Sequence, residues 1–110
     1  MRALHLPGVP IVAGSDQGVP GHTLHRELEL YGDAGFTPLD ALATATSTPA
    51  RVMGAAARTG ALASGLDADV VLVDGRPDES IRALRNVRLV IRRGVVFDPA
   101  RLWRSIGFEP

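Results

Sequence analysis

A short apolar run followed by a polar loop is the first ordered pattern along the chain. Residues 9–14, VPIVAG, form an almost continuous series of apolar side chains, which is typical of a strand buried on both faces in a parallel sheet. Pro10 suits the start of such a strand, where no backbone donor is needed. The next seven residues are rich in glycine, proline and polar side chains. The pattern therefore predicts a strand that ends in a polar loop.

Three helices are predicted after this loop. The first covers residues 24–34 and ends at Gly35; its apolar face consists of Leu24, Leu28 and Tyr31, whereas Glu27 and Glu29 point elsewhere. Thr37 and Pro38 predict the start of a second helix, with the threonine as its cap and the proline in its first turn, and this helix runs to about residue 46. Thr48 and Pro49 repeat this pattern of a capping threonine and a first-turn proline, and they predict a third helix over residues 50–57. Strand, loop and helices in this order are typical of a β/α unit.

The character of the chain changes near Gly60, where β-branched residues become frequent. We expect two units, residues 1–59 with the β/α character and residues 60–110 with β-rich character. The second unit is predicted to contain a strand over 69–74, a helical turn over 79–84, a hairpin of strands 86–92 and 95–97 joined at Arg93 and Gly94, and a short helix over 100–106.

Composition narrows the classes of function. The chain has 110 residues, and its twelve acidic side chains balance twelve basic ones to a net charge of +0, which argues against a nucleic-acid partner. All the basic residues are arginines, so a lysine-based mechanism is excluded, and the lack of cysteine excludes disulfides and thiolate chemistry. No apolar run approaches the roughly 20 residues of a membrane span, so no membrane partner is expected. Location stays open, with the cytoplasm slightly favoured.

The sharpest candidate for chemistry is Asp16, which follows the predicted strand directly. Residues at the carboxyl ends of strands face the ligand site in β/α barrels and open α/β sheets. An aspartate there can bind a metal ion or accept a proton from a water molecule. The alternative is an aspartate that only stabilises its loop by accepting hydrogen bonds from nearby amides.

Two histidines follow in the same region. His22 and His25 are three residues apart, and together with Asp16 they reach the three protein ligands of a catalytic metal site. An autonomous metal site is therefore one interpretation, and ordinary solvated or hydrogen-bonded histidines are the other. His5 has no such context and is expected to be structural. The loop before the helix lacks the glycine order and the lysine of a phosphate-binding loop.

Several segments together resemble the end of a metal-dependent amidohydrolase, in the imidazolonepropionase-like and Xaa-Pro-dipeptidase-like branch. They extend over essentially the whole chain, and the ordered series is far more specific than any one motif. The segments are VPIVAGSD at 9–16, HRELEL at 25–30, AGFTPLDAL at 34–42, ATAT at 43–46, PAR at 49–51, TGAL at 59–62, ADVVLVDG at 68–75, VVFDP at 95–99 and the tail 103–110.

The resemblance implies an α/β fold in which residues 1–59 form the last β/α unit, with helices, of a (β/α)8 barrel. Residues 60–110 would be strands of a composite β-sandwich with a C-terminal tail. Asp16 would follow the eighth barrel strand, contact the metal and take a proton from the attacking water. Gln17 and His22 would line the substrate mouth. The implied cofactor is a divalent metal, with zinc the expected ion, and the implied substrate is a small amide or dipeptide.

The chain is much shorter than a complete barrel, which needs about 250 residues. It resembles about the last quarter of the enzyme and has no counterpart of the family's paired histidines, bridging lysine or glutamate, and two later histidines. We therefore expect the C-terminal portion of an amidohydrolase that hydrolyses a C–N bond, inactive and without a stably bound metal as this chain alone. The alternatives are a non-catalytic interaction module that associates with itself, or half of a split enzyme whose barrel is on another polypeptide.

Overall fold

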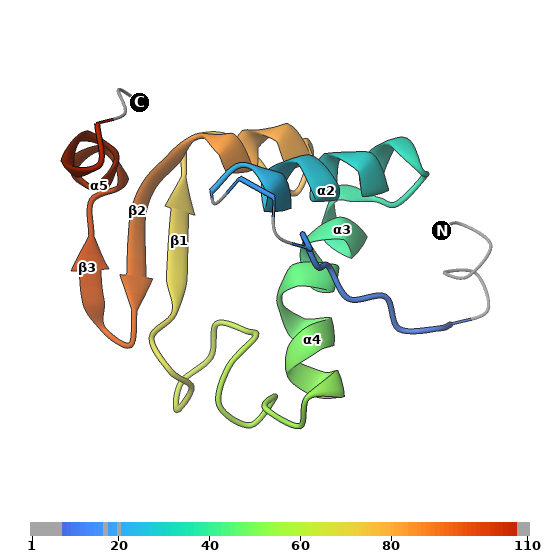
Figure 1. Cartoon of the computed structure of the whole chain (residues 1–110). Coiled ribbons are helices and arrows are strands. Elements are labelled where there is room, and N and C mark those ends of the chain that lie inside the picture. Colours follow the sequence, from blue (N-terminus) through green and yellow to red (C-terminus); the bar gives the residue numbers. More distant parts are fainter. Residues whose placement is uncertain (1–7, 17, 20, 108–110) are drawn as a thin grey trace.

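An antiparallel sheet of three strands lies beside a group of helices (Figure 1). The structure, a computed structural model, describes residues 8–16, 18, 19 and 21–107. None of the helices within these ranges is long and apolar enough to cross a bilayer. In chain order the elements are α2 (Thr23–Asp33), α3 (Pro38–Ala45), α4 (Ser47–Val52), β1 (Val70–Val73), the 3-10 helix η1 (Ile81–Arg85), β2 (Val87–Arg92), β3 (Val95–Phe97) and α5 (Pro99–Ser105).

The junction between α2 and α3 confirms the local signals in the sequence. Gly35 adopts a φ of 95°, a conformation that glycine reaches without steric cost, and the following N–H of Phe36 donates to the carbonyl of Tyr31 at 3.0 Å. The hydroxyl oxygen of Thr37 accepts a hydrogen bond from the N–H of Asp40 at 3.1 Å. The predicted stop of the first helix and the predicted cap of the second are therefore both present.

Helix α4 differs from its prediction. It spans Ser47–Val52 rather than residues 50–57, and Thr46, not Thr48, is its N-terminal cap residue. Proline needs no donor in the first turn of a helix, so Pro49 is accommodated inside α4 rather than marking its boundary. The helix ends before Gly54, which adopts a φ of 70°.

The predicted strand at residues 9–14 is wrong, because this segment forms no strand. Its side chains alternate instead: Ile11 and Ala13 pack against the core, whereas Val9 and Val12 are more than two-fifths exposed. A strand requires a neighbour that pairs its backbone groups, and no strand of the described chain lies beside this segment. The apolar run therefore covers the helices with one face only.

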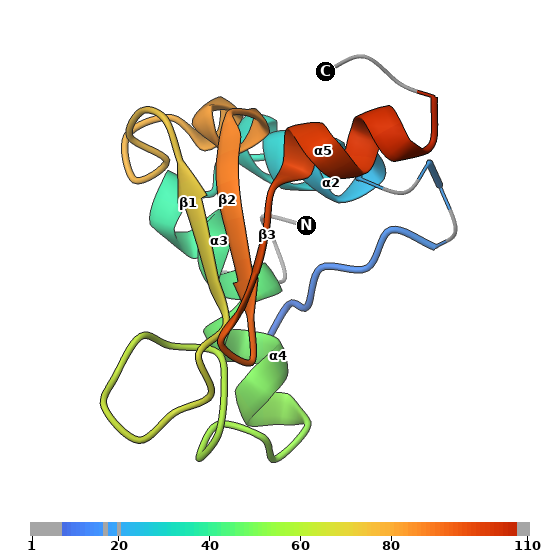
Figure 2. The same ribbon diagram turned by 90° about the vertical axis from the view of Figure 1, so that its left-hand side faces the viewer.

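The sheet has the order β1-β2-β3, with both pairs antiparallel. Arg93 and Gly94 have φ values of 50° and 79°, as a two-residue hairpin turn requires, and the predicted hairpin is confirmed. The N–H of Arg93 also donates to the carboxylate of Asp69 at 2.8 Å, which joins the turn to the residue before β1. Helix α5 lies at the end of the sheet where β3 finishes (Figure 2). More than half of the surface of Val71, Leu72, Val95 and Val96 is exposed.

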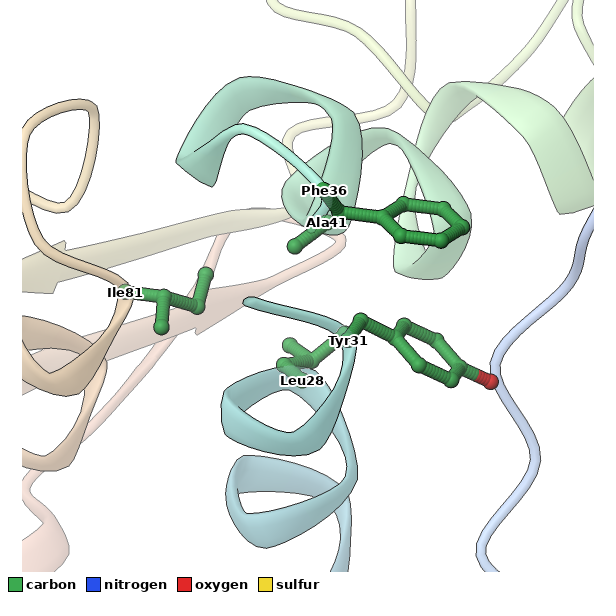
Figure 3. Packing of buried hydrophobic residues seen from close by; sticks show 5 residues of the cluster. All are labelled: Leu28, Tyr31, Phe36, Ala41 and Ile81. Carbon is green, nitrogen blue, oxygen red and sulfur yellow. The ribbon is translucent and has the colours of Figure 1, made fainter. Parts of the chain in front are cut away.

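The apolar core joins residues from both halves of the sequence. Leu28 and Tyr31 of α2, Phe36, Ala41 of α3 and Ile81 of η1 form one buried cluster (Figure 3). The rings of Tyr31 and Phe36 stack with centroids 5.4 Å apart. Because Ile81 comes from the β-rich half, the two predicted units share this core.

An ion pair between a buried carboxylate and an exposed arginine joins the same two halves. The side chain of Glu29 is only 5% exposed, and its carboxylate accepts hydrogen bonds from Arg85 at 2.5 Å and Arg26 at 3.2 Å. The hydrogen bond from Arg85 is the largest cause that lowers the pKa of Glu29, to about 2. Glu29 therefore lies against η1, whose arginine compensates the cost of burying a carboxylate.

Gly60 lies where the chain passes closest to α4. It has a φ of 92°, and a Cβ placed there would come within 2.5 Å of the Ala50 Cβ and 2.9 Å of the Thr46 carbonyl oxygen. Gly65 has a similar φ of 88°, but a Cβ there would meet nothing within 4 Å. Both positions thus favour glycine because of their positive φ, but only Gly60 also lacks room for a side chain.

We predict that Gly60→Ala destabilises the chain more than Gly65→Ala does. Both alanines carry the cost of a left-handed backbone, about 1–2 kcal/mol, but only Gly60→Ala adds overpacking, which costs about 1–3 kcal/mol. Free energies of unfolding from denaturant titration measure the difference. Equal losses in the two variants would show that the approach of residue 60 to α4 is not tight in solution.

The Glu29–Arg85 pair predicts a pH dependence of stability. Because the folded-state pKa of Glu29 is depressed, its contribution is complete above the ordinary value of 4.5 and is lost as the pH falls toward 2. Arg85→Gln should lower the melting temperature at neutral pH and flatten its decline between about pH 5 and pH 2. Arg88→Gln is the control, because Arg88 and Asp74 form a pair that is exposed on both sides and contributes little. Parallel pH profiles for the native chain and Arg85→Gln would contradict the assignment.

Candidate active site

Asp16 ends the segment that passes along the helices. Its side chain is exposed, and its φ is 41°, in the left-handed region that aspartate tolerates better than most residues. No side-chain hydrogen bond or ion pair within the described ranges engages its carboxylate. Within the described part of the chain, the carboxylate is therefore presented to solvent.

Two hydrogen bonds fix the chain shortly before Asp16. The N–H of Ala13 donates to the carbonyl of Thr44 in α3 at 2.8 Å. The N–H of Gly14 donates to Oε1 of Glu27 in α2 at 2.9 Å. The segment thus obtains from two helices the backbone partners that a neighbouring strand would otherwise supply.

Glu27 has a second donor in Tyr31, whose hydroxyl also donates to Oε1. Figure 3 shows this hydroxyl directed out of the core cluster toward the N-terminal segment. Burial, followed by the hydrogen bond to Glu27 and the charge of Glu27, raises the pKa of Tyr31 to about 12. The expectation that Glu27 points elsewhere is therefore wrong. The signal that could have found this contact is the spacing of four between the two residues, which places them on one helix face.

The two histidines have different surroundings. His22 precedes α2 as its cap residue, and its ring lies 5.4 Å from the ring of Trp103 in α5. Trp103 also contacts Gly21, where a Cβ would come within 2.9 Å of the indole. His25 lies in the first turn of α2, and burial, then the charges of Arg85 and His22, lower its pKa. His25 is therefore neutral at neutral pH.

These side chains do not assemble into a metal site. Among the residues that the structure describes, no three His, Asp or Glu side chains come close enough to hold a metal ion. The interpretation of Asp16, His22 and His25 as an autonomous site is therefore wrong, because the ring of His22 lies against Trp103 of α5 and His25 is half-buried in the first turn of α2. Gln17 and His5 lie outside the described residues.

A small cavity of about 200 Å³ lies at the other end of the same segment. Its wall includes Val9, Phe36, Asp40, Thr48 and Arg51, and neither Asp16 nor His22 lines it. The cavity is therefore distinct from the candidate active site.

Comparison with known proteins identifies the class. The family model described as "Amidohydrolase family" matches residues 1–97, so the chain belongs to the amidohydrolase family and the resemblance seen in the sequence is confirmed. Enzymes of this family are generally metal-dependent hydrolases. The solved structures that are similar to this chain are (β/α)8 barrel enzymes.

Three relatives illustrate the similarity. Ochratoxinase from Aspergillus niger is 32% identical over 105 residues, which are 94% of this chain and 21% of that protein. A Xaa-Pro dipeptidase solved with methionine in its active site is 32% identical with a TM-score of 0.80, over 88% of this chain and 24% of the other. A Bifidobacterium longum putative prolidase is 39% identical with a TM-score of 0.81, over 87% and 25%. The chain therefore spans between a fifth and a quarter of these relatives.

The contact between Glu27 and Tyr31 yields a spectroscopic prediction. Glu27→Gln should lower the pKa of Tyr31 from about 12, because the negative charge beside the phenol is removed. The pKa should stay above the ordinary value of 10.0, since burial is the largest cause of the shift. Tyr31 is the chain's only tyrosine, so ultraviolet absorbance during alkaline titration reports it alone. Glu79→Gln, a change at an exposed carboxylate that pairs with Arg76, serves as the control. An unaltered pKa in Glu27→Gln would disprove the contact.

Proposed function

We propose that this chain is the C-terminal portion of an amidohydrolase that hydrolyses a C–N bond in an amide, peptide or cyclic amide. Residues 1–59 would supply the last β/α unit of a barrel, and residues 60–110 would supply strands of the composite sandwich. The observation that carries the proposal is the exposed Asp16, placed at the end of a segment that two helices hold by its backbone. This arrangement lies inside the part of the chain that matches the family.

In this proposal Asp16 is the base of the reaction. It accepts a proton from the water whose oxygen attacks the carbonyl carbon, and it passes that proton to the nitrogen as the C–N bond breaks. An exposed carboxylate that no side chain of the described ranges engages is free to take both roles. Gln17 and His22 are proposed to contact the substrate. The relatives named as a Xaa-Pro dipeptidase and a putative prolidase make dipeptides with a C-terminal proline the first substrates to test.

The metal of the proposed enzyme needs ligands beyond those described here. Asp16 is the proposed contribution of this chain, and zinc is the proposed ion. Because the chain spans only about a quarter of its relatives and its own donors do not converge, the other ligands would come from the remaining barrel. That barrel is either part of the same protein or a separate polypeptide.

A chimera tests the proposal. This chain replaces the matching quarter of the Bifidobacterium longum putative prolidase, and the product is assayed with Zn²⁺ or Mn²⁺ against Xaa-Pro dipeptides and a panel of amides. We expect hydrolysis by the chimera and none by the 110-residue chain alone. Asp16→Asn in the chimera should lower the rate about 10²–10⁴-fold, as loss of a general base does. Asp33→Asn, an exposed change at the end of α2, is the matched control.

Two outcomes would contradict this view. Turnover by the chain alone that disappears in Asp16→Asn would show that it needs no further barrel. A chimera that folds and takes up metal, yet hydrolyses nothing, would favour the non-catalytic alternative. In that alternative the chain associates with a second copy of itself through the exposed apolar residues of the sheet. Size-exclusion chromatography of the chain would detect this dimer.

A further inference from the structure

We propose that Glu27 is a positioning residue of the candidate active site: it fixes the peptide that presents Asp16. The inference rests on the proposed role of Asp16 and extends it to a residue that contacts neither substrate nor water in that role. Glu27 acts through the backbone of Gly14, two residues before the aspartate.

The first argument is that Gly14 has no side-chain packing of its own and is oriented by a hydrogen bond. Gly14 is exposed, and a Cβ built there would meet no atom within 4 Å. Ala13 packs against the core and anchors the chain before this residue, and the hydrogen bond of 2.9 Å from the Gly14 N–H to Glu27 orients the Gly14 peptide. A hydrogen bond to an ionised acceptor is about twice as strong as one between neutral groups.

The second argument is that Glu27 is itself fixed from the core. The hydroxyl of Tyr31 donates to the same carboxylate oxygen that receives the Gly14 N–H. Tyr31 is only 5% exposed and stacks on Phe36, so its ring has little freedom. The apolar cluster therefore holds Tyr31, the hydroxyl of Tyr31 holds the carboxylate of Glu27, and that carboxylate holds the N–H of Gly14.

The third argument concerns Asp16. Its φ of 41° places it in a region that costs energy for a residue with a side chain. Such a conformation persists only when its surroundings determine it. Only Ser15 separates Asp16 from the fixed peptide of Gly14, so the hydrogen bond to Glu27 is close enough to select this conformation.

The experiment uses the whole chain labelled with ¹⁵N and compares Glu27→Gln with Glu79→Gln by NMR. Glu27→Gln retains the shape of the side chain but replaces an ionised acceptor by a neutral amide. We expect the Gly14 amide proton to move upfield, its hydrogen exchange to accelerate by about 10-fold or more, and the Asp16 resonances to shift. Glu79→Gln should leave both residues unchanged.

The result that would overturn the proposal is an unchanged Asp16 in Glu27→Gln, even if the stability of the chain falls. That pattern would assign Glu27 a purely structural role in α2. Tyr31→Phe is the second variant, because it removes one donor from the carboxylate and leaves the bond to Gly14 possible. We expect Asp16 to shift less in Tyr31→Phe than in Glu27→Gln.

Kinetics in the prolidase chimera separate this inference from the proposed function. Where the unsubstituted chimera is active, Glu27→Gln should lower kcat about 10–100-fold, the usual effect of losing a residue that orients an active-site group. KM should change much less, because Glu27 does not contact the substrate. The Glu27→Asp chimera should be less active than the unsubstituted chimera, because the shorter side chain cannot reach both the Gly14 N–H and the Tyr31 hydroxyl. An inactive unsubstituted chimera would count against the proposed function alone, and the NMR comparison would still decide the role of Glu27.

Discussion

The ion pair between Glu29 and Arg85 determines how the two halves of the chain meet. A carboxylate that is 5% exposed needs a partner to compensate its lost hydration, and the arginine that supplies it lies 56 residues further along the sequence. That pairing sets η1 against α2 and brings Ile81 into the core. Residues two apart do not share a helix face. Glu27 is therefore free to face the N-terminal segment while Glu29 faces η1, and α2 carries both connections.

Features that depend on neighbouring residues could be predicted from the sequence. The cap at Thr37, the stop at Gly35 and the turn at Arg93 and Gly94 each follow from a few adjacent side chains and their preferred dihedral angles. The strand expected at residues 9–14 could not be predicted reliably in the same way. Hydropathy indicates burial, but a strand also needs a neighbour with free backbone groups, and the neighbour here is a pair of helices.

In the candidate site, too, local features could be predicted and contacts between distant residues could not. Asp16 is a candidate because it follows an apolar run, which is a local signal; its side chain is exposed, and its role stays a prediction. The contribution of Glu27 could not be found from the pattern of polar positions, which places charged side chains on the solvent side by default. Its partner Gly14 is thirteen residues away and carries no side chain. The histidine pair failed as a metal site because sequence spacing does not fix where a cap residue points.

The chain's only tryptophan lies on α5 against the residues that lead from the candidate site into α2. Trp103 is half-buried and lies outside the apolar cluster, so its fluorescence reports the local fit of α5 against His22 and Gly21. Unfolding of that cluster reaches the indole only when α5 detaches. Intrinsic fluorescence and circular dichroism of this protein will therefore follow different events, and coincident transitions would indicate that loop, terminal helix and core unfold as one cooperative unit.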